Sequence, residues 1–280
     1  MEEAPLRPRN RIAPRKVFCG WVLAVALVSG CATTVDPRSV DNDGLLSAID
    51  VDNVEYVQAA VKSGAITPNQ RIPAPGYHRG TPLITLAARA GSVGVLQYLI
   101  GAGANLNARS PYDETALMLA CFFMSEQEGM GASYERHETA ARILVEAGAS
   151  LEAARDGYTP LSYAAYQGRD NTIRFLLARG ARVDGYVQDG IIYLPTPLMM
   201  ATMMGHEEAA RLLLEAGANA RLRVQAGNTA FELARKYRQT HLFPMLRCAE
   251  GLPRGQKFSQ WCEGVTSTNS FIPAGLFRRQ

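Results

Sequence analysis

The chain has 280 residues, 47% of them hydrophobic, and a formal net charge of +3. Residues 1–30 hold five basic and two acidic residues, so the remainder has 24 of each and is formally neutral. The composition therefore gives no support for a nucleic-acid-binding protein, which would need a concentrated basic surface.

The first thirty residues have the layout of a secretory signal peptide. Basic residues come first, at Arg7, Arg9, Arg11, Arg15 and Lys16. An almost wholly apolar run of 14 residues, 17–30, follows them. This run is too short for an ordinary membrane-spanning helix and is typical of a signal-peptide core. An uncleaved N-terminal anchor is the alternative interpretation.

The run ends in Leu27-Val28-Ser29-Gly30-Cys31, which resembles the lipobox of bacterial lipoproteins. The resemblance implies cleavage before Cys31, diacylation of that cysteine and attachment to a membrane through its acyl chains. Ala32 follows the cysteine, and by resemblance to Gram-negative lipoproteins this favours the outer membrane, with the chain facing the periplasm. Residues 31–42 are then expected to be a tether.

A phrase of the form Thr-Pro-Leu recurs through the next two hundred residues. Its threonines are Thr81, Thr115, Thr159, Thr196 and Thr229, spaced 34, 44, 37 and 33 residues apart. Two copies depart from it: Ala116 and Ala230 replace the proline, and Phe231 replaces the leucine. In the copy at Thr159, the threonine is placed to cap a helix and Pro160 falls in its first turn, where a missing N–H costs nothing. Gly168 then ends this helix and a second apolar helix follows. One such helix pair cannot bury its own apolar face, so the pairs are predicted to stack.

This period and wording resemble the ankyrin repeat. The resemblance implies an all-α ankyrin-repeat solenoid of about six stacked helix-turn-helix repeats with β-hairpin loops, over residues 43–249. Residues 45–65 form a degenerate first copy, and residues 227–248 form a last copy that lacks the final Gly-Ala. Two irregularities interrupt the period: an insertion of about 11 residues within 124–137, between the helices of repeat three, and a lengthened finger at 183–194. Either is a candidate binding element or a tolerated loop.

Residues 250–280 show no repeat pattern but carry Phe258 and Trp261, and we expect them to pack on the last repeat. Cys248 and Cys262 flank the start of this extension. In an oxidising periplasm they are expected to form a disulfide, with two unrelated free thiols as the alternative. Cys121 is expected to be an inert core thiol.

No catalytic constellation is visible in the sequence. The four histidines, His78, His137, His206 and His241, are scattered, and no serine-hydrolase, zinc-protease or phosphate-loop motif occurs. We therefore expect a protein that is not an enzyme and that holds no cofactor and no metal.

In an ankyrin array the hairpin tips and the ends of the first helices line a concave groove, and those positions are the expected partner-binding residues. Aromatic and methionine side chains, the types enriched in binding hot spots, occupy many of them. They are Tyr77, Tyr112, Phe122, Phe123, Tyr158, Tyr166, Tyr193, Met203, Met204 and Tyr237. The alternative for some of the Phe and Met residues is packing between repeats.

The resemblance implies a non-catalytic module that binds a folded protein partner. Our leading hypothesis is a lipid-anchored immunity protein that neutralises an envelope-targeting toxin such as a lipase, partly by analogy with ankyrin-like lipoproteins. A scaffold or stress-protection factor for resident envelope proteins is the main alternative. A surface-exposed or host-directed adaptor is a third.

Overall fold

The computed structural model describes residues 40–74, 76–122, 130–152, 158–185, 194–224, 227–253 and 255–262. Backbone contacts divide the chain into Met1–Thr34 and Val35–Gln280, and every described residue belongs to the second unit. The expected signal peptide, Cys31 and most of the tether lie outside the described residues.

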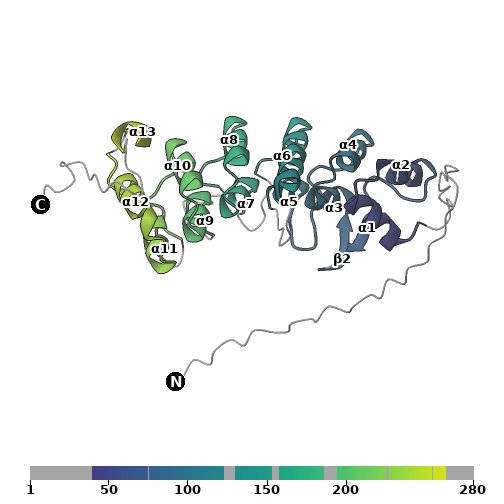
Figure 1. The fold of residues 1–280 in the computed structure, drawn as a ribbon, viewed down its shortest axis with the longest axis horizontal. Helices are drawn as coiled ribbons and strands as arrows, with labels where there is room; N and C mark the ends of the chain where they lie inside the picture. Colours follow the sequence, from purple (N-terminus) through teal and green to yellow (C-terminus); the bar gives the residue numbers. More distant parts are fainter. Residues whose placement is uncertain are drawn as a thin grey trace, which may run out of the picture. The chain divides into compact units, whose positions relative to one another are not determined.

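The described part is built from helix pairs joined by short turns (Figure 1). The first helices of the pairs are α1 (Asn42–Asp50), α3 (Leu83–Ala90), α5 (Ala116–Cys121), α7 (Pro160–Tyr166), α9 (Pro197–Met204) and α11 (Ala230–Lys236). The second helices are α2 (Val54–Lys62), α4 (Val93–Gly101), α6 (Met130–Glu146), α8 (Asp170–Ala178), α10 (Glu207–Glu215) and α12 (Phe243–Glu250), the last preceded by the 3-10 turn η1 (Thr240–Leu242).

The pairs stack in chain order. Each first helix from α1 to α9 contacts the next first helix, and α2, α4, α6, α8 and α10 form a second row in the same way. The row of second helices continues through α13 (Phe258–Trp261), which contacts α10. Because each pair touches mainly its neighbours, the apolar faces form one continuous core.

The recurring phrase of the sequence explains the local structure of the first helices. The hydroxyl oxygens of Thr115, Thr159, Thr196 and Thr229 each accept a hydrogen bond from the backbone N–H three residues later, at 3.3 Å. This satisfies an N–H that the helix itself cannot pair. Leucine and alanine follow on the inner side, and Leu161, Ala164 and Ala165 have no exposed surface. The predicted core of this repeat is confirmed.

Among the described residues, the expected β-hairpin loops contain little regular strand. Within the described ranges the only sheet pairs β1 (Arg71–Ala74) with β2 (Tyr77–Pro82), antiparallel, with Ile72 opposite Thr81 and an irregularity before Ala74. The next finger has a single isolated bridge between Arg109 and Thr115. Side-chain hydrogen bonds inside that finger take the place of a longer ladder, as described below.

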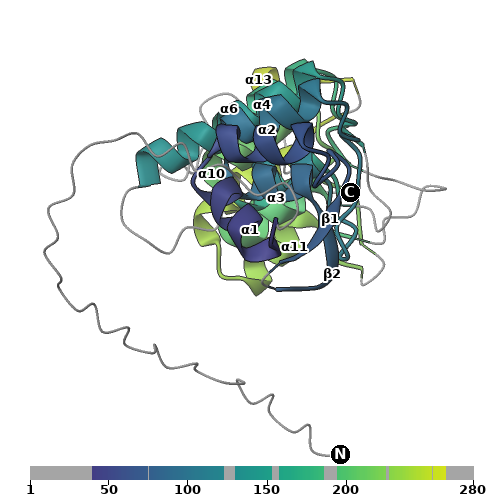
Figure 2. The same ribbon diagram turned by 90° about the vertical axis from the view of Figure 1, so that its right-hand side faces the viewer.

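The insertion in repeat three, expected between the two helices as a binding element or a tolerated loop, is helical from Met130 onward. The second helix of this repeat, α6, begins at Met130 and has 17 residues, whereas α4, α8 and α10 have 9 each. The extra turns therefore precede the usual start of the helix. Figure 2 looks along the stack and shows β1 and β2 on one side of the helices, with the start of α6 extending on the other.

The C-terminal extension packs against the last repeats through α13. Phe258 is buried, and the Sγ atoms of Cys248 in α12 and Cys262 after α13 are 2.02 Å apart, forming a disulfide. The Arg221 guanidinium donates to the carbonyl oxygens of Glu250 at 2.7 Å and Leu252 at 2.6 Å. The segment after α12 is thus held by one covalent bond and two charge-assisted hydrogen bonds. Residues 263–280 lie outside the described residues.

A ladder of side-chain to backbone hydrogen bonds joins the loops of successive repeats. Asn69 Oδ1 accepts from the N–H of Asn105 at 2.7 Å, and Asn107 Oδ1 accepts from the N–H of Ser150 at 2.9 Å. Further along, Glu152 Oε1 accepts from the N–H of Arg182, and Asp184 Oδ1 accepts from the N–H of Asn219 at 2.9 Å. Two members of the ladder are therefore neutral amides and two are carboxylates.

Asp184→Asn is expected to raise the free energy of unfolding at pH 7 by less than about 1 kcal/mol. Burial raises the pKa of Asp184, partly countered by the Asn219 N–H. Folding therefore favours the protonated acid, so its contribution is present below the unfolded pKa and is lost as pH rises through the folded pKa. Asparagine keeps the acceptor without a charge. Urea unfolding at pH 7 and pH 3 should show the gain only at pH 7; an equal change at both would contradict this.

Candidate functional site

The predicted groove positions comprise hairpin tips and the C-terminal ends of the first helices. The seventh residues after four capping threonines are Phe122, Tyr166, Met203 and Lys236. Each lies at or next to the end of its helix, because the helices in these repeats are six to eight residues long. Since α5, α7, α9 and α11 contact one another in sequence, these positions follow a line along the array.

Repeats three and four meet in an aromatic cluster, which we define as Phe122, Tyr158, Tyr163 and Tyr166. The Phe122 ring lies edge-on to Tyr163 with centroids 5.5 Å apart, and 6.0 Å from Tyr166. Tyr158 meets Tyr163 edge-on at 6.5 Å. All four side chains are partly exposed. Such contacts contribute about 0.5–1.5 kcal/mol per pair beyond area burial. They hold the rings in place before any partner arrives.

Tyr163 was missing from the predicted site, although it makes two of the three ring contacts. It lies three residues before Tyr166 on α7, so both rings emerge on the same side of the helix. That spacing is the signal that could have identified it. Burial raises the pKa of Tyr158, so its hydroxyl stays protonated at neutral pH and can donate a hydrogen bond.

Methionine and tyrosine continue the line beyond the cluster. Met203 is partly buried against the core, which matches the alternative of inward packing. Met204 and Tyr237 are each 43% exposed, and the Lys236 ammonium is 5.8 Å from the centroid of the Tyr237 ring. Met204 ends α9 and Tyr237 directly follows α11, and these two helices are in contact; exposed apolar side chains mark an interaction surface where they form a contiguous patch.

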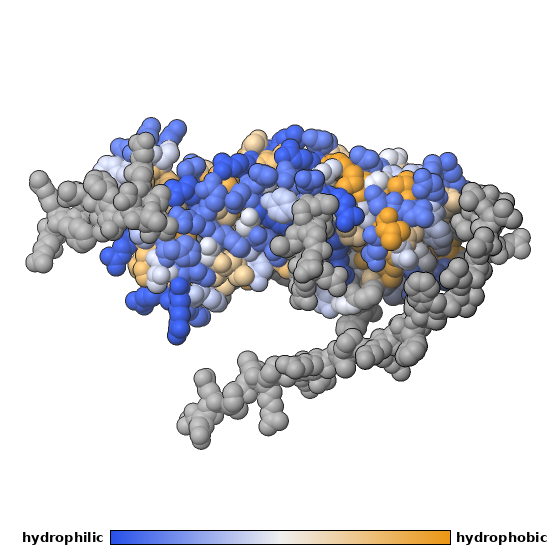
Figure 3. Space-filling model, viewed as in Figure 1, coloured by the Kyte–Doolittle hydropathy of each residue, from blue (hydrophilic) through white to orange (hydrophobic). Residues whose placement is uncertain are grey.

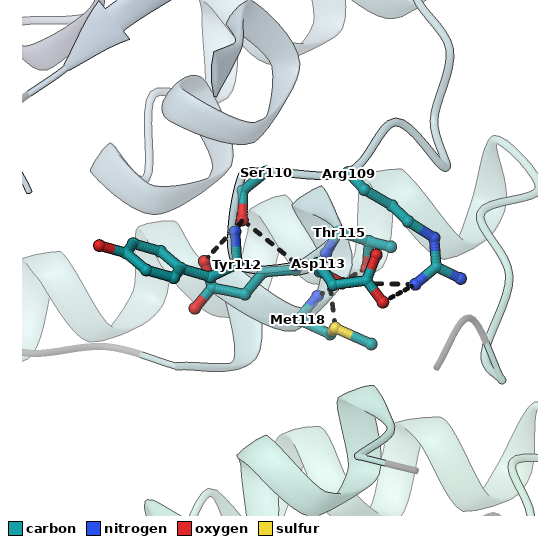
Figure 4. A network of polar contacts seen from close by, with 7 residues as sticks. Arg109, Ser110, Tyr112, Asp113, Thr115 and Met118 are labelled. Atoms are coloured by element: carbon teal, nitrogen blue, oxygen red, sulfur yellow. Dashed lines mark hydrogen bonds and ion pairs between the residues drawn. The ribbon is translucent and has the colours of Figure 1, made fainter. Parts of the chain in front are cut away.

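Tyr112 stands on a rigid finger (Figure 4). Its side chain is 57% exposed, and its hydroxyl donates to the carbonyl oxygen of Gly76 in the preceding finger at 2.9 Å. The Ser110 hydroxyl accepts from the N–H groups of Tyr112 and Glu114, and the Arg109 guanidinium pairs with the Asp113 carboxylate at 2.6 Å. Figure 4 shows Tyr112 and Arg109 pointing to opposite sides of the turn. The tyrosine is therefore presented on an ordered support.

Three expected groove residues are not placed. Phe123 and Tyr193 lie outside the described residues, and for Tyr77 only the backbone, in β2, is described. The Asp189-Gly190 turn of the lengthened finger is also outside them. These positions remain predictions.

Tyr134 and Arg169 form a contact at the extended start of α6 that was also absent from the prediction. The Arg169 guanidinium lies 4.5 Å from the centroid of the Tyr134 ring, and Arg169 is only 5% exposed. Desolvation, partly offset by the nearby Tyr134 and Cys121, lowers the pKa of Arg169. The two neighbouring repeats have a histidine at the position of Arg169, namely His137 and His206. The replacement of histidine by arginine at this position of the repeat is the signal that could have identified Arg169.

The histidines whose side chains are described make structural hydrogen bonds. His137, His206 and His241 each have Nε2 bonded to a carbonyl oxygen of the preceding repeat, at 2.9 to 3.1 Å, which is a structural role. Burial raises the pKa of the Cys121 thiol to about 12, so it is not a nucleophile at neutral pH. No group of three or more metal-binding side chains occurs in the described ranges.

A bilayer span requires a helix that is both long and apolar. Among the described residues, no helix meets both requirements.

Comparison with known proteins identifies the repeats. A family model described as ankyrin repeats in three copies matches residues 130–189, and a single ankyrin-repeat model matches residues 79–111 and 196–223. Mouse ankyrin repeat and SOCS box protein 16 is 43% identical over 102 residues, which is 36% of this chain and 21% of that protein. An ankyrin repeat-containing protein of Treponema pallidum is 35% identical over 122 residues, 43% of this chain and 40% of that protein.

A third relative, a homologue of transient receptor potential cation channel subfamily A member 1 from Caenorhabditis elegans, is 29% identical over 136 residues, 49% of this chain and 10% of that protein. The matches span less than half the length of each of these relatives. They support the repeat unit rather than the activity of any whole protein. The matched segments and the stacked helix pairs show that this chain carries ankyrin repeats folded as an all-α ankyrin solenoid, the architecture of a protein–protein interaction module.

Proposed function

We propose that this protein is a non-catalytic binding protein, and that the groove along its first helices binds a folded partner through the aromatic cluster. The single observation that supports this most strongly is the set of partly exposed rings at the junction of repeats three and four, fixed by mutual contacts of 5.5 to 6.5 Å. Rigid aromatic side chains lose little conformational entropy on binding, so more of the contact energy remains as affinity.

The proposal extends to a lipid-anchored immunity protein whose partner is an envelope-targeting toxin such as a lipase. Its support is the lipobox-like sequence ending at Cys31, which would place the array where such toxins act, and the preformed character of the groove. A scaffold for resident envelope proteins is the alternative. A dedicated inhibitor should bind with a nanomolar or lower Kd, whereas a scaffold is expected in the micromolar range.

The Phe122→Ala, Tyr166→Ala double variant is expected to weaken partner binding by about 2 kcal/mol, roughly 30-fold, because it removes two hot-spot aromatic groups. The full chain, tagged, serves as bait for envelope extracts and for extracts of toxin-secreting cells, and the captured partner is titrated by calorimetry. Circular dichroism should show unchanged helical content.

Phe175→Ala is the matched control. Phe175 is another partly buried aromatic residue, but it lies on α8 in the row of second helices, between the guanidinium groups of Arg142 and Arg179. It should leave partner binding unchanged. Equal losses in both variants would contradict the groove proposal. A single toxin retained through stringent washing would support immunity, whereas several resident proteins lost on washing would support a scaffold.

A further inference from the structure

The last repeat ends in an exposed basic run, which we name the basic corner: Arg235, Lys236 and Arg238, with Tyr237 between them. Arg235 and Lys236 lie in the last turn of α11, where cations are favoured by the helix dipole. The dipole does not account for Arg238, which lies beyond the helix. All four side chains are exposed to solvent. The corner therefore concentrates three positive charges in four residues.

Arg238 has an unusual backbone for its side chain. It is the ninth residue after its capping threonine, and Gly168 and Gly205 hold that position in the two preceding repeats. Those glycines have φ of +64° and +79°, and Arg238 has φ of +60°, the left-handed region that is sterically costly for any residue with a Cβ. A large cation thus stands where neighbouring repeats use glycine.

Asp52 shows what normally offsets such a cost. It adopts φ of +56° in the turn between α1 and α2, and its carboxylate accepts hydrogen bonds from the N–H groups of Gly94 at 3.0 Å and Val95 at 2.8 Å, at the start of α4. The Arg238 guanidinium makes no comparable hydrogen bond, ion pair or ring contact with another described residue. Backbone strain that no internal contact offsets is typical of functional positions.

In the described part of the chain, no side-chain ion pair at 4.0 Å or less joins Arg235, Lys236 or Arg238 to a carboxylate, although Glu232 lies near Arg235. Glu232 is the acidic residue of α11, and its Oε2 already accepts from the N–H of Thr229 at 2.7 Å and pairs with Arg223 at 3.1 Å. A polar hollow of about 310 Å³ beside the corner is lined by Gly227, Asn228, Glu232, Arg235 and Lys236. Figure 3 shows hydrophilic side chains projecting from the lower edge of α11.

We propose that the basic corner binds an acidic segment of the protein that occupies the groove. Guanidinium and ammonium groups form charge-assisted hydrogen bonds with carboxylates, and Tyr237 supplies an aromatic anchor among them. Met204 is the last residue of α9, Tyr237 is the first residue after α11, and both are exposed. Since α9 and α11 are in contact, the basic corner lies in line with the groove positions. Three cations mixed with tyrosine and methionine fit a protein better than an anionic membrane, which is typically recognised by clusters of four to eight basic residues.

This inference rests on the proposed function in taking the partner to be the protein that occupies the groove. Its test uses the full chain in detergent with a fluorescein-labelled 20-residue poly-L-glutamate as probe, followed by fluorescence anisotropy at low salt. Arg238→Gly is expected to weaken probe binding at least threefold while leaving the melting temperature unchanged or higher, since glycine suits the left-handed backbone. The triple variant Arg235→Gln, Lys236→Gln, Arg238→Gly should weaken it at least tenfold.

Arg182→Gln is the charge-matched control, because Arg182 is an exposed arginine in the loop after α8. It should leave probe binding unchanged. Equal losses in the control and the corner variants, no binding by the wild type, or tighter corner-dependent binding to phosphatidylglycerol vesicles than to the probe would overturn the inference. The Phe122→Ala, Tyr166→Ala variant should still bind the probe, so a failure of the groove proposal appears in partner capture alone.

Discussion

Gly168→Ala is expected to lower the free energy of unfolding by about 3 kcal/mol, a large loss for the addition of one methyl group. Gly168 has φ of +64°, so alanine incurs the steric cost of the left-handed region, roughly 1 kcal/mol. A Cβ on Gly168 would also lie 2.6 Å from Nδ1 and 2.7 Å from Cγ of His206. The imidazole would have to move, and its Nε2 hydrogen bond to the carbonyl oxygen of Tyr166, at 3.1 Å, would be lost.

Gly180→Ala separates the cost of the left-handed backbone from the cost of displacing the His206 ring. Gly180 has φ of +89°, but a Cβ at this position would meet no heavy atom of another segment within 4 Å, so only the backbone cost of about 1 kcal/mol should appear. Urea unfolding of both variants, with the slope of the transition unchanged, gives the difference. Equal losses in the two variants would show that the His206 contact between repeats contributes nothing. The His206 ring is bonded to the carbonyl oxygen of Tyr166, which belongs to the aromatic cluster. A larger loss of unfolding free energy in Gly168→Ala than in Gly180→Ala would therefore also connect the position of the cluster to the packing between repeats.

The stacked helix pairs could be predicted from the sequence because their signals are local. A capping threonine, a proline in the first turn and a glycine after the last turn each act within a few residues. The same pattern recurs at Thr159 and Thr196, and the structure gives both threonines the predicted capping bond.

The start of α6 could not be predicted in this way. Gly129 and Gly131 lower the helix propensity of the insertion, and the insertion has no counterpart in the other repeats to compare with. Tertiary contacts outweigh that propensity. The Tyr134 ring packs on the Arg169 guanidinium, and His137 Nε2 is bonded to the carbonyl oxygen of Arg89, 48 residues away in the chain. Contacts between residues so far apart are not visible in a local pattern.

The positions of the candidate site residues along the repeats could be predicted, but the contacts between their side chains could not. The spacing of the repeats placed Phe122 and Tyr166 at the ends of neighbouring first helices, and the centroids of their rings lie 6.0 Å apart. It gave no means of knowing that Tyr163 would join them, or that Met203 would pack toward the core. Those outcomes depend on how the repeats are rotated against one another, which is set by packing between helices rather than by spacing along one.

Reducing the disulfide between Cys248 and Cys262 is expected to lower the free energy of unfolding by about 3 kcal/mol. The two cysteines are 14 residues apart in the chain and close a loop of about 15 residues, and the cross-link removes the corresponding freedom from the unfolded chain. Both cysteines are almost fully buried, at 4% and 2% exposure, so the bond joins α13 to the end of the core rather than linking surface loops.

The measurement compares oxidised and reduced wild type by urea unfolding, since the two forms differ in the covalent link alone. The Cys248→Ser, Cys262→Ser variant should match or fall below the reduced form, because it also places two hydroxyl groups in buried positions. The remaining thiol of the described part, Cys121, is 1% exposed and should stay unreactive toward iodoacetamide until the protein unfolds. Equal stability of the oxidised and reduced forms would mean that Phe258 and the Arg221 hydrogen bonds hold α13 in place without the disulfide, and that the loop gains no order from the cross-link.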